Sequence, residues 1–326
     1  ADDATDDFTS AGSVTLTASG DIGGPGPGDN ALEIADGVAV TASSSGGAVA
    51  LASGGVLDVG ASDAATGLTL SGTTVNLSGA TYDSDDGDIT LNGTVELVNA
   101  GPVLDSDADD AGTDGNIIVN GAVTDSGNDS ALTLDADGGT VTIDDVQVNG
   151  QFNVTGSTIN IAGTDTAINS NIGDAQFTGD LDVTGDGNAS VTVGGAPGDL
   201  TITGSVSDTG NDSALTLEAN AGTTTVGDVT IAGDLVLGGA TVNLPGTTYA
   251  STGGSVSIDR AVLQAGATTT VTSGGGAGED ITFTTDIEDA TSTSTLQLDA
   301  GPDGDVSVAG AAGGVGALQA FVVDAA

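Results

Sequence analysis

The chain has 326 residues, of which 47 are acidic and one, Arg260, is basic, so its formal net charge is −46. It contains no His, Cys, Met or Lys, which excludes disulfides, thiolate or imidazole metal sites and catalysis by a His, Cys or Lys side chain. Such dense negative charge repels nucleic-acid phosphates and anionic membranes. No apolar run approaches the ~20 residues of a membrane span, so we expect neither nucleic-acid binding nor membrane insertion.

Short runs of alternating apolar and polar residues recur along the whole chain, and most of them end at Gly or Asp. This alternation is the period of a β-strand with one buried face, closed by turn residues. The 55 Gly, and the excess of Asp (42) over Glu (5), argue against helices. In chain order, the predicted strands include residues 14–18 (VTLTA), 68–72 (LTLSG), 89–93 (ITLNG), 141–145 (VTIDD), 152–156 (FNVTG), 191–195 (VTVGG), 235–239 (LVLGG) and 256–260 (VSIDR).

An internal repeat organises these strands. The stretch GNDSALTL occurs at residues 127–134 and again 83 positions later, at 210–217. A looser copy occupies residues 279–300, and a fainter one begins at Gly47. A second marker, TVNL or TINI, recurs at 74–77, 158–161 and 241–244. We therefore predict a super-repeat of about 83 residues, with copies near 1–66, 67–149, 150–233 and 234–326.

The repeated short strands predict one elongated, all-β, right-handed parallel β-helix, or β-solenoid. Each rung would take about 21 residues, so four rungs would complete one unit of the super-repeat; the right-handed sense follows from the usual hand of parallel crossovers. Inward Val, Leu and Ile would form columns, and Tyr82 and Tyr249, two periods apart, would take equivalent packing positions. The alternative is a string of β-sandwich domains of about 83 residues each. The frequent alternating runs and the scarcity of Pro (six residues) disfavour it.

Several segments of the chain resemble the repeats of a known protein family. The segments GSVTLTASGDIG (12–23), EDITFTTDI (279–287) and residues 294–326 are similar to the repeats of filamentous-haemagglutinin-like bacterial surface proteins, through a degenerate G-[DN]-[IVL]-T-[IVLF] pattern. The resemblance implies a right-handed parallel β-helix, export from the cell, and service as an adhesin stalk or extracellular fibre. The Asn-Pro motif of that family's secretion domain does not occur here, so the resemblance is to the shaft.

The densest acidic cluster suggests calcium. Asp105, Asp107 and Asp109 alternate like the first ligands of a calcium loop, and Asp110 and Asp114 follow them. An EF-hand would need Gly at position 110 and Glu at 116, so a simpler oxygen-rich site on a turn is the hypothesis. The competing interpretation is a solvated turn with diffuse counter-ions. Residues 82–88 and 184–190 are weaker candidates.

These observations favour a secreted structural protein and not an enzyme. We expect the shaft of an extracellular fibre, extended by end-to-end stacking of copies of the chain, because the sequence stops within a repeat unit at Ala326. The alternative is a cell-surface adhesin whose lateral face recognises a glycan or another surface. No cofactor is required, and calcium is the one candidate. Arg260 is expected to pair with a neighbouring acid, and salt or calcium to stabilise so acidic a fold.

Overall fold

The chain is all-β in the part that the computed structural model describes. Its 33 strands form a parallel β-solenoid of about 13 turns, with equivalent strands about 22 residues apart, which confirms the predicted fold class. No helix in the described part is long and apolar enough to cross a membrane. Two compact units, Ala1–Ile159 and Asn160–Ala326, divide the chain and are described separately. The described residues are 8–9, 12–24, 31–108, 114–125, 127, 129–185, 187–195, 197–208, 213–264, 266–313 and 316–325.

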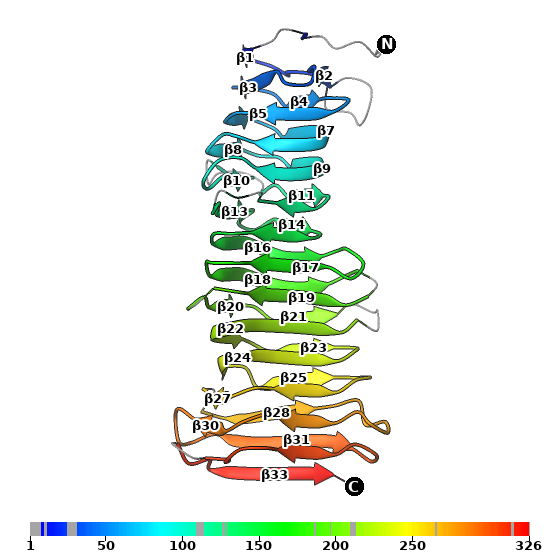
Figure 1. The fold of residues 1–326 in the computed structure, drawn as a ribbon, viewed down its shortest axis with the longest axis vertical. Coiled ribbons are helices and arrows are strands. Elements are labelled where there is room, and N and C mark those ends of the chain that lie inside the picture. Colours follow the sequence, from blue (N-terminus) through cyan, green and yellow to red (C-terminus); the bar gives the residue numbers. More distant parts are fainter. Residues whose placement is uncertain are drawn as a thin grey trace. The chain divides into compact units, whose positions relative to one another are not determined.

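In the first unit, successive coils stack in parallel (Figure 1) and build three ladders. One ladder runs β2–β4–β7–β9–β11–β14, the second β5–β7–β9–β12–β15, and the third β6–β8–β10–β13–β16. The long strands β7 and β9 bend at a corner and so belong to two ladders each. The strands are β1 (Ser13–Ala18), β2 (Leu32–Glu33), β3 (Ala39–Ser44), β4 (Val49–Ala52), β5 (Val56–Val59), β6 (Ser62–Ala64), β7 (Leu68–Leu77), β8 (Thr81–Ser84), β9 (Ile89–Leu97), β10 (Val103–Asp105), β11 (Ile117–Asn120), β12 (Val123–Thr124), β13 (Leu132–Asp135), β14 (Thr140–Ile143), β15 (Val146–Val148) and β16 (Phe152–Ile161).

The second unit repeats this plan. Its ladders are β17–β19–β22–β24–β26–β29–β32, β18–β20–β22–β24–β27–β30 and β18–β21–β23–β25–β28–β31–β33. All the pairings with a described register are parallel. The strands are β17 (Ala167–Ser170), β18 (Ala175–Val183), β19 (Ala189–Val193), β20 (Leu200–Ile202), β21 (Val206–Asp208), β22 (Leu215–Val226), β23 (Val229–Ile231), β24 (Leu235–Leu244), β25 (Thr248–Ser251), β26 (Val256–Ile258), β27 (Ala261–Leu263), β28 (Thr268–Thr272), β29 (Ile281–Phe283), β30 (Ile287–Asp289), β31 (Thr295–Gly301), β32 (Val306–Val308) and β33 (Ala320–Ala325).

Apolar columns fill the interior of each unit, as the alternation predicts. Leu132 and Leu134 lie in register with Phe152 and Val154 of the next coil, and all four are at most 2% exposed. Because neighbouring coils place like residues above one another, each inward side chain contacts the ones directly above and below it. Burying one such aliphatic side chain contributes about 1.5–3 kcal/mol, so these columns hold the coils in register.

The super-repeat does not match a whole number of coils, which corrects the expectation of four rungs per unit. Leu217 lies in β22 and pairs with β19 and β24, whereas Leu298, its equivalent in the next repeat copy, lies in β31 and pairs with β28 and β33. These two residues therefore belong to different ladders of the second unit. A feature that recurs with the repeat can thus move to another side of the coil. The division into four copies within one body stays a prediction.

One buried polar group conflicts with the apolar interior. Thr269 of β28 is fully buried, and its Oγ1 has no hydrogen-bond partner within the described residues. An unpaired buried hydroxyl costs about 1–3 kcal/mol, and Val has nearly the same shape. We expect Thr269→Val to raise the free energy of unfolding by about 1 kcal/mol, measured by chemical denaturation. Thr270→Val, at the outward-facing neighbour, is the control and should have little effect.

Candidate functional site

Aspartates at the coil corners join each coil to the next. In eleven of them, one carboxylate oxygen accepts a hydrogen bond from a backbone N–H of the following coil, at 2.6–3.0 Å. Coils are about 4.8 Å apart, and the short Asp side chain spans that step. A hydrogen bond to a charged group contributes about 1.5–3 kcal/mol. The eleven are Asp21, Asp36, Asp88, Asp165, Asp174, Asp180, Asp199, Asp228, Asp234, Asp280 and Asp286.

A sequence signal for these contacts exists, although the sequence interpretation assigned the aspartates only to turns. Several of them directly precede an apolar residue that opens a strand, as in Asp88-Ile89, Asp199-Leu200 and Asp228-Val229. This is the Asp of the G-[DN]-[IVL]-T pattern. Its role is therefore to bind the next coil, which explains why Asp, with its short side chain, is preferred to Glu.

A second set of aspartates faces outward on one ladder of the first unit. Asp63, Asp83, Asp105 and Asp135 are successive register partners on β6, β8, β10 and β13. Their Cα atoms are therefore about one coil step apart, ~4.8 Å. Like charges placed directly opposite each other on neighbouring strands are destabilising. We call these four residues the aspartate column. Burial, and then the charges of Asp105 and Asp63, raise the pKa of Asp83.

The aspartate column predicts a salt-dependent stability. Asp83→Asn removes the central charge, so we expect it to raise the free energy of unfolding by about 0.5–1 kcal/mol at low salt. In ~1 M salt, where the screening length is only about 3 Å, the gain should vanish. The control is Asp86→Asn, an exposed residue of the adjacent turn with the same change in charge. Equal effects for both variants in urea denaturation would show that net charge, and not the column, is responsible.

The predicted calcium residues are only partly described by the structure. Asp105 belongs to the aspartate column, and Asp107 is buried. The hydroxyl of the intervening Ser106 donates to the Gly115 carbonyl at 2.9 Å. The carboxylate of Asp114 lies over Gly138 of the next coil. Asp109 and Asp110 lie outside the described residues. Among the residues that are described, no three carboxylates are placed to share a metal ion, and calcium stays a prediction.

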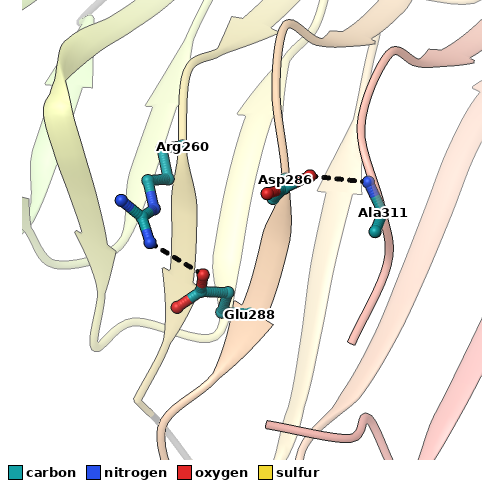
Figure 2. Close-up of polar contacts among 4 residues, drawn as sticks. All are labelled: Arg260, Asp286, Glu288 and Ala311. Carbon is teal, nitrogen blue, oxygen red and sulfur yellow. Dashed lines mark hydrogen bonds and ion pairs between the residues drawn. The ribbon is translucent and has the colours of Figure 1, made fainter. Parts of the chain in front are cut away.

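The lone cation pairs with an acid, as expected. Arg260 Nη2 donates to Glu288 Oε1 at 2.9 Å, which links the turn after β26 to β30. The hydrogen bond and charge of Glu288 raise the pKa of Arg260. Figure 2 shows that Asp286 turns away from this pair, because its carboxylate accepts the Ala311 N–H at 2.7 Å. The arginine side chain is half exposed, so the pair contributes little to stability.

The repeated GNDSALTL stretch contains the end of a third aspartate motif. In three loops, an Asp accepts the backbone N–H of the Ser five positions later. The pairs are Asp125 and Ser130 at 2.8 Å, Asp208 and Ser213 at 3.2 Å, and Asp289 and Ser294 at 2.6 Å. The last copy is the tightest: Asp289 is 2% exposed and also accepts the Ser294 hydroxyl and the N–H and hydroxyl of Thr291. Burial acts to raise the pKa of Asp289, but these four donors lower it to about 2.

Tyr82 and Tyr249 occupy the same local setting, as the repeat predicts. Both are fully buried, and each hydroxyl accepts the N–H of the glycine three positions before it, Gly79 or Gly246, at 2.8 and 2.9 Å. Each also donates to a valine carbonyl of the preceding coil. Burial is the main cause that raises the pKa of both hydroxyls. The two tyrosines therefore have a packing role and close one coil onto the one before.

Comparison of the chain with protein-family models, with curated proteins and with solved structures gives no match. The fold and the composition place the chain in the class of acidic parallel β-solenoids. The residues that its contacts single out are the coil-joining aspartates, the aspartate column and the three Asp–Ser loops.

Proposed function

We propose that the chain is a secreted, non-catalytic structural protein that forms the shaft of an extracellular fibre, extended coil upon coil by end-to-end stacking. The observation that carries the proposal is the coil-joining aspartate. Each of the eleven carboxylates takes its partner N–H from the following coil, and this contact uses only backbone atoms of that coil. Any further coil of similar geometry, from more of the same chain or from another copy, supplies the same partner.

The last described coil offers the groups that such a coil would meet. The backbone N–H of Asp305 donates to the Asp280 carboxylate at 2.9 Å, and the Asp305 side chain occupies the position from which earlier aspartates reach the next coil. On β33, Phe321 and Val323 continue the inward column of Leu296 and Leu298, yet they are 42 and 44% exposed. A stacked coil would cover both side chains. It would also pair with the open edge of β33, because an unpaired strand edge favours pairing with another strand.

Electron microscopy of the purified chain tests the proposal. Salt of about 0.5 M or more should be present, because the net charge opposes stacking until it is screened. We expect filaments one coil wide whose length grows with concentration. Val323→Lys places a charge at the stacking end and should leave short particles, whereas Ile172→Lys, on a lateral loop where Ile172 is 59% exposed, should assemble normally. Wild-type protein that stays as single particles at every salt and protein concentration would overturn the proposal.

The extracellular assignment has a separate test. Antibodies against the folded chain should label intact cells of the source organism without permeabilisation. Labelling that requires permeabilised cells would contradict it.

A further inference from the structure

A groove of about 570 Å³ lies along one side of the second unit, at the starts of β17, β19, β22 and β24. It crosses four successive coils, so its length is about three coil steps, ~14 Å. Asp165 lies at one end and Asp234 at the other. Between them lie Ser190 and Thr216, which are register partners in neighbouring coils. The remaining lining residues are Thr166, Asn188, Ala189, Ala214 and Val236.

The groove combines fixed hydrogen-bonding groups with an aliphatic strip. Asp165 Oδ1 accepts the Asn188 N–H at 3.0 Å and Asp234 Oδ1 accepts the Ser255 N–H at 2.7 Å, so both carboxylates are held in place by the next coil. Each carboxylate keeps a second oxygen, Oδ2, that can accept a hydrogen bond from a ligand. Val236 is register partner to Thr216 and is 36% exposed. Its side chain therefore faces solvent beside hydroxyl groups.

Two residues that line the groove are not shared with the preceding copy of the repeat. Residues 151–161 (QFNVTGSTINI) align with 234–244 (DLVLGGATVNL). Gln151 and Asn153 therefore stand where the groove has Asp234 and Val236. The earlier copy has a polar residue, Asn153, at this outward strand position. The second copy replaces it with an aliphatic one, and it does so where the groove is.

We propose that this groove binds an uncharged oligosaccharide of about three sugar units, which makes the lateral side of the shaft adhesive. Carboxylates fixed at each end accept hydrogen bonds from pairs of sugar hydroxyls, Ser190 and Thr216 bond the middle sugar, and Val236 packs against the C–H face of a ring. The coil step is close to the length of one hexose ring, so a linear chain of about three sugars spans the three coil steps between the two carboxylates. Anionic sugars are excluded by Asp165, Asp234 and the acidic surface around them.

Calorimetric and NMR titration of the full chain with defined hexasaccharides tests the groove. We expect weak, saturable binding of β-linked hexamers of glucose or N-acetylglucosamine, and none of a galacturonic acid hexamer. Thr216→Val removes one hydroxyl at constant shape and should weaken binding about two- to tenfold. Val236→Asn, which restores the residue of the preceding repeat copy, should also weaken it. Thr282→Val is the matched control: Thr282 faces outward on the same ladder but lies outside the groove, and its affinity should match wild type.

Three results would overturn the inference. One is the absence of saturable binding to both neutral hexamers. Another is equal loss of affinity in Thr216→Val and Thr282→Val. The third is binding confined to a glucosamine hexamer and abolished by about 0.5 M salt, because attraction to the charged surface would then explain it. Circular dichroism of each variant confirms folding, and filament formation by Thr216→Val separates this site from the stacking end.

Discussion

Replacing Asp289 by Asn is expected to lower the free energy of unfolding by about 2–4 kcal/mol at neutral pH. The carboxylate is 2% exposed and accepts four hydrogen bonds, two from Thr291 and two from Ser294. Asn keeps the shape, but its amide NH₂ faces donors and leaves at least one of them unpaired. Each unsatisfied buried donor costs about 1–3 kcal/mol. Urea denaturation followed by circular dichroism measures the loss.

The pH dependence of this loss gives a sharper test. The folded pKa of Asp289 is about 2, below the value of ~3.9 in an unfolded chain. The stabilisation is therefore fully present above about pH 4 and disappears as pH falls through about 2. The difference between wild type and Asp289→Asn should shrink over the same range. Asp303→Asn, an exposed residue with the same charge change, should show no such convergence, and a constant difference down to about pH 2 would contradict the assignment.

The fold was predictable because its main signal is local. A short run of alternating residues shows its buried face without knowledge of its neighbours, and the repeat shows that such strands continue along the chain. The interior positions of Leu132, Leu134 and the two tyrosines followed from that pattern. The number of coils per repeat did not follow, because it depends on how far each corner turns the chain.

The polar contacts between coils were harder to predict, because they join residues of different coils and the local alternation does not show which residues meet. Sequence spacing within the aspartate column is uneven: the step from Asp105 to Asp135 is longer than those that join Asp63, Asp83 and Asp105. It is longer because more residues separate the end of β10 at Asp105 from the start of β11 at Ile117 than separate the equivalent strands of neighbouring coils. Sequence spacing therefore conceals that the four share one register. Likewise, the partner of each coil-joining aspartate is a backbone N–H, which leaves no trace in residue identity.

Tyr82→Phe is expected to cost about 1–3 kcal/mol although it removes a single oxygen atom. In the folded chain that oxygen accepts the Gly79 N–H and donates to the Val59 carbonyl at 2.7 Å. Phe fills the same volume but leaves the Gly79 N–H buried without its acceptor, whereas the Val59 carbonyl keeps the hydrogen bond from the Ser78 N–H at 2.8 Å. Tyr249→Phe should have a similar effect in the second unit, where Gly246 and Val226 are the partners. Urea denaturation measures both losses.

The same hydroxyls predict how the fold responds to alkali. Burial raises the pKa of both tyrosines above the value of ~10 in an unfolded chain. The stability that the two hydroxyls give the fold is therefore fully present below about pH 10. It is lost as pH rises further, because the tyrosines ionise more easily in the unfolded chain than in the folded one. With two Tyr and no Trp, tyrosinate absorbance reports these residues alone, and each single variant leaves one reporter. Absorbance should rise together with unfolding, seen by circular dichroism. Ionisation near pH ~10 in a chain that is still folded would show that the hydroxyls are not buried as described.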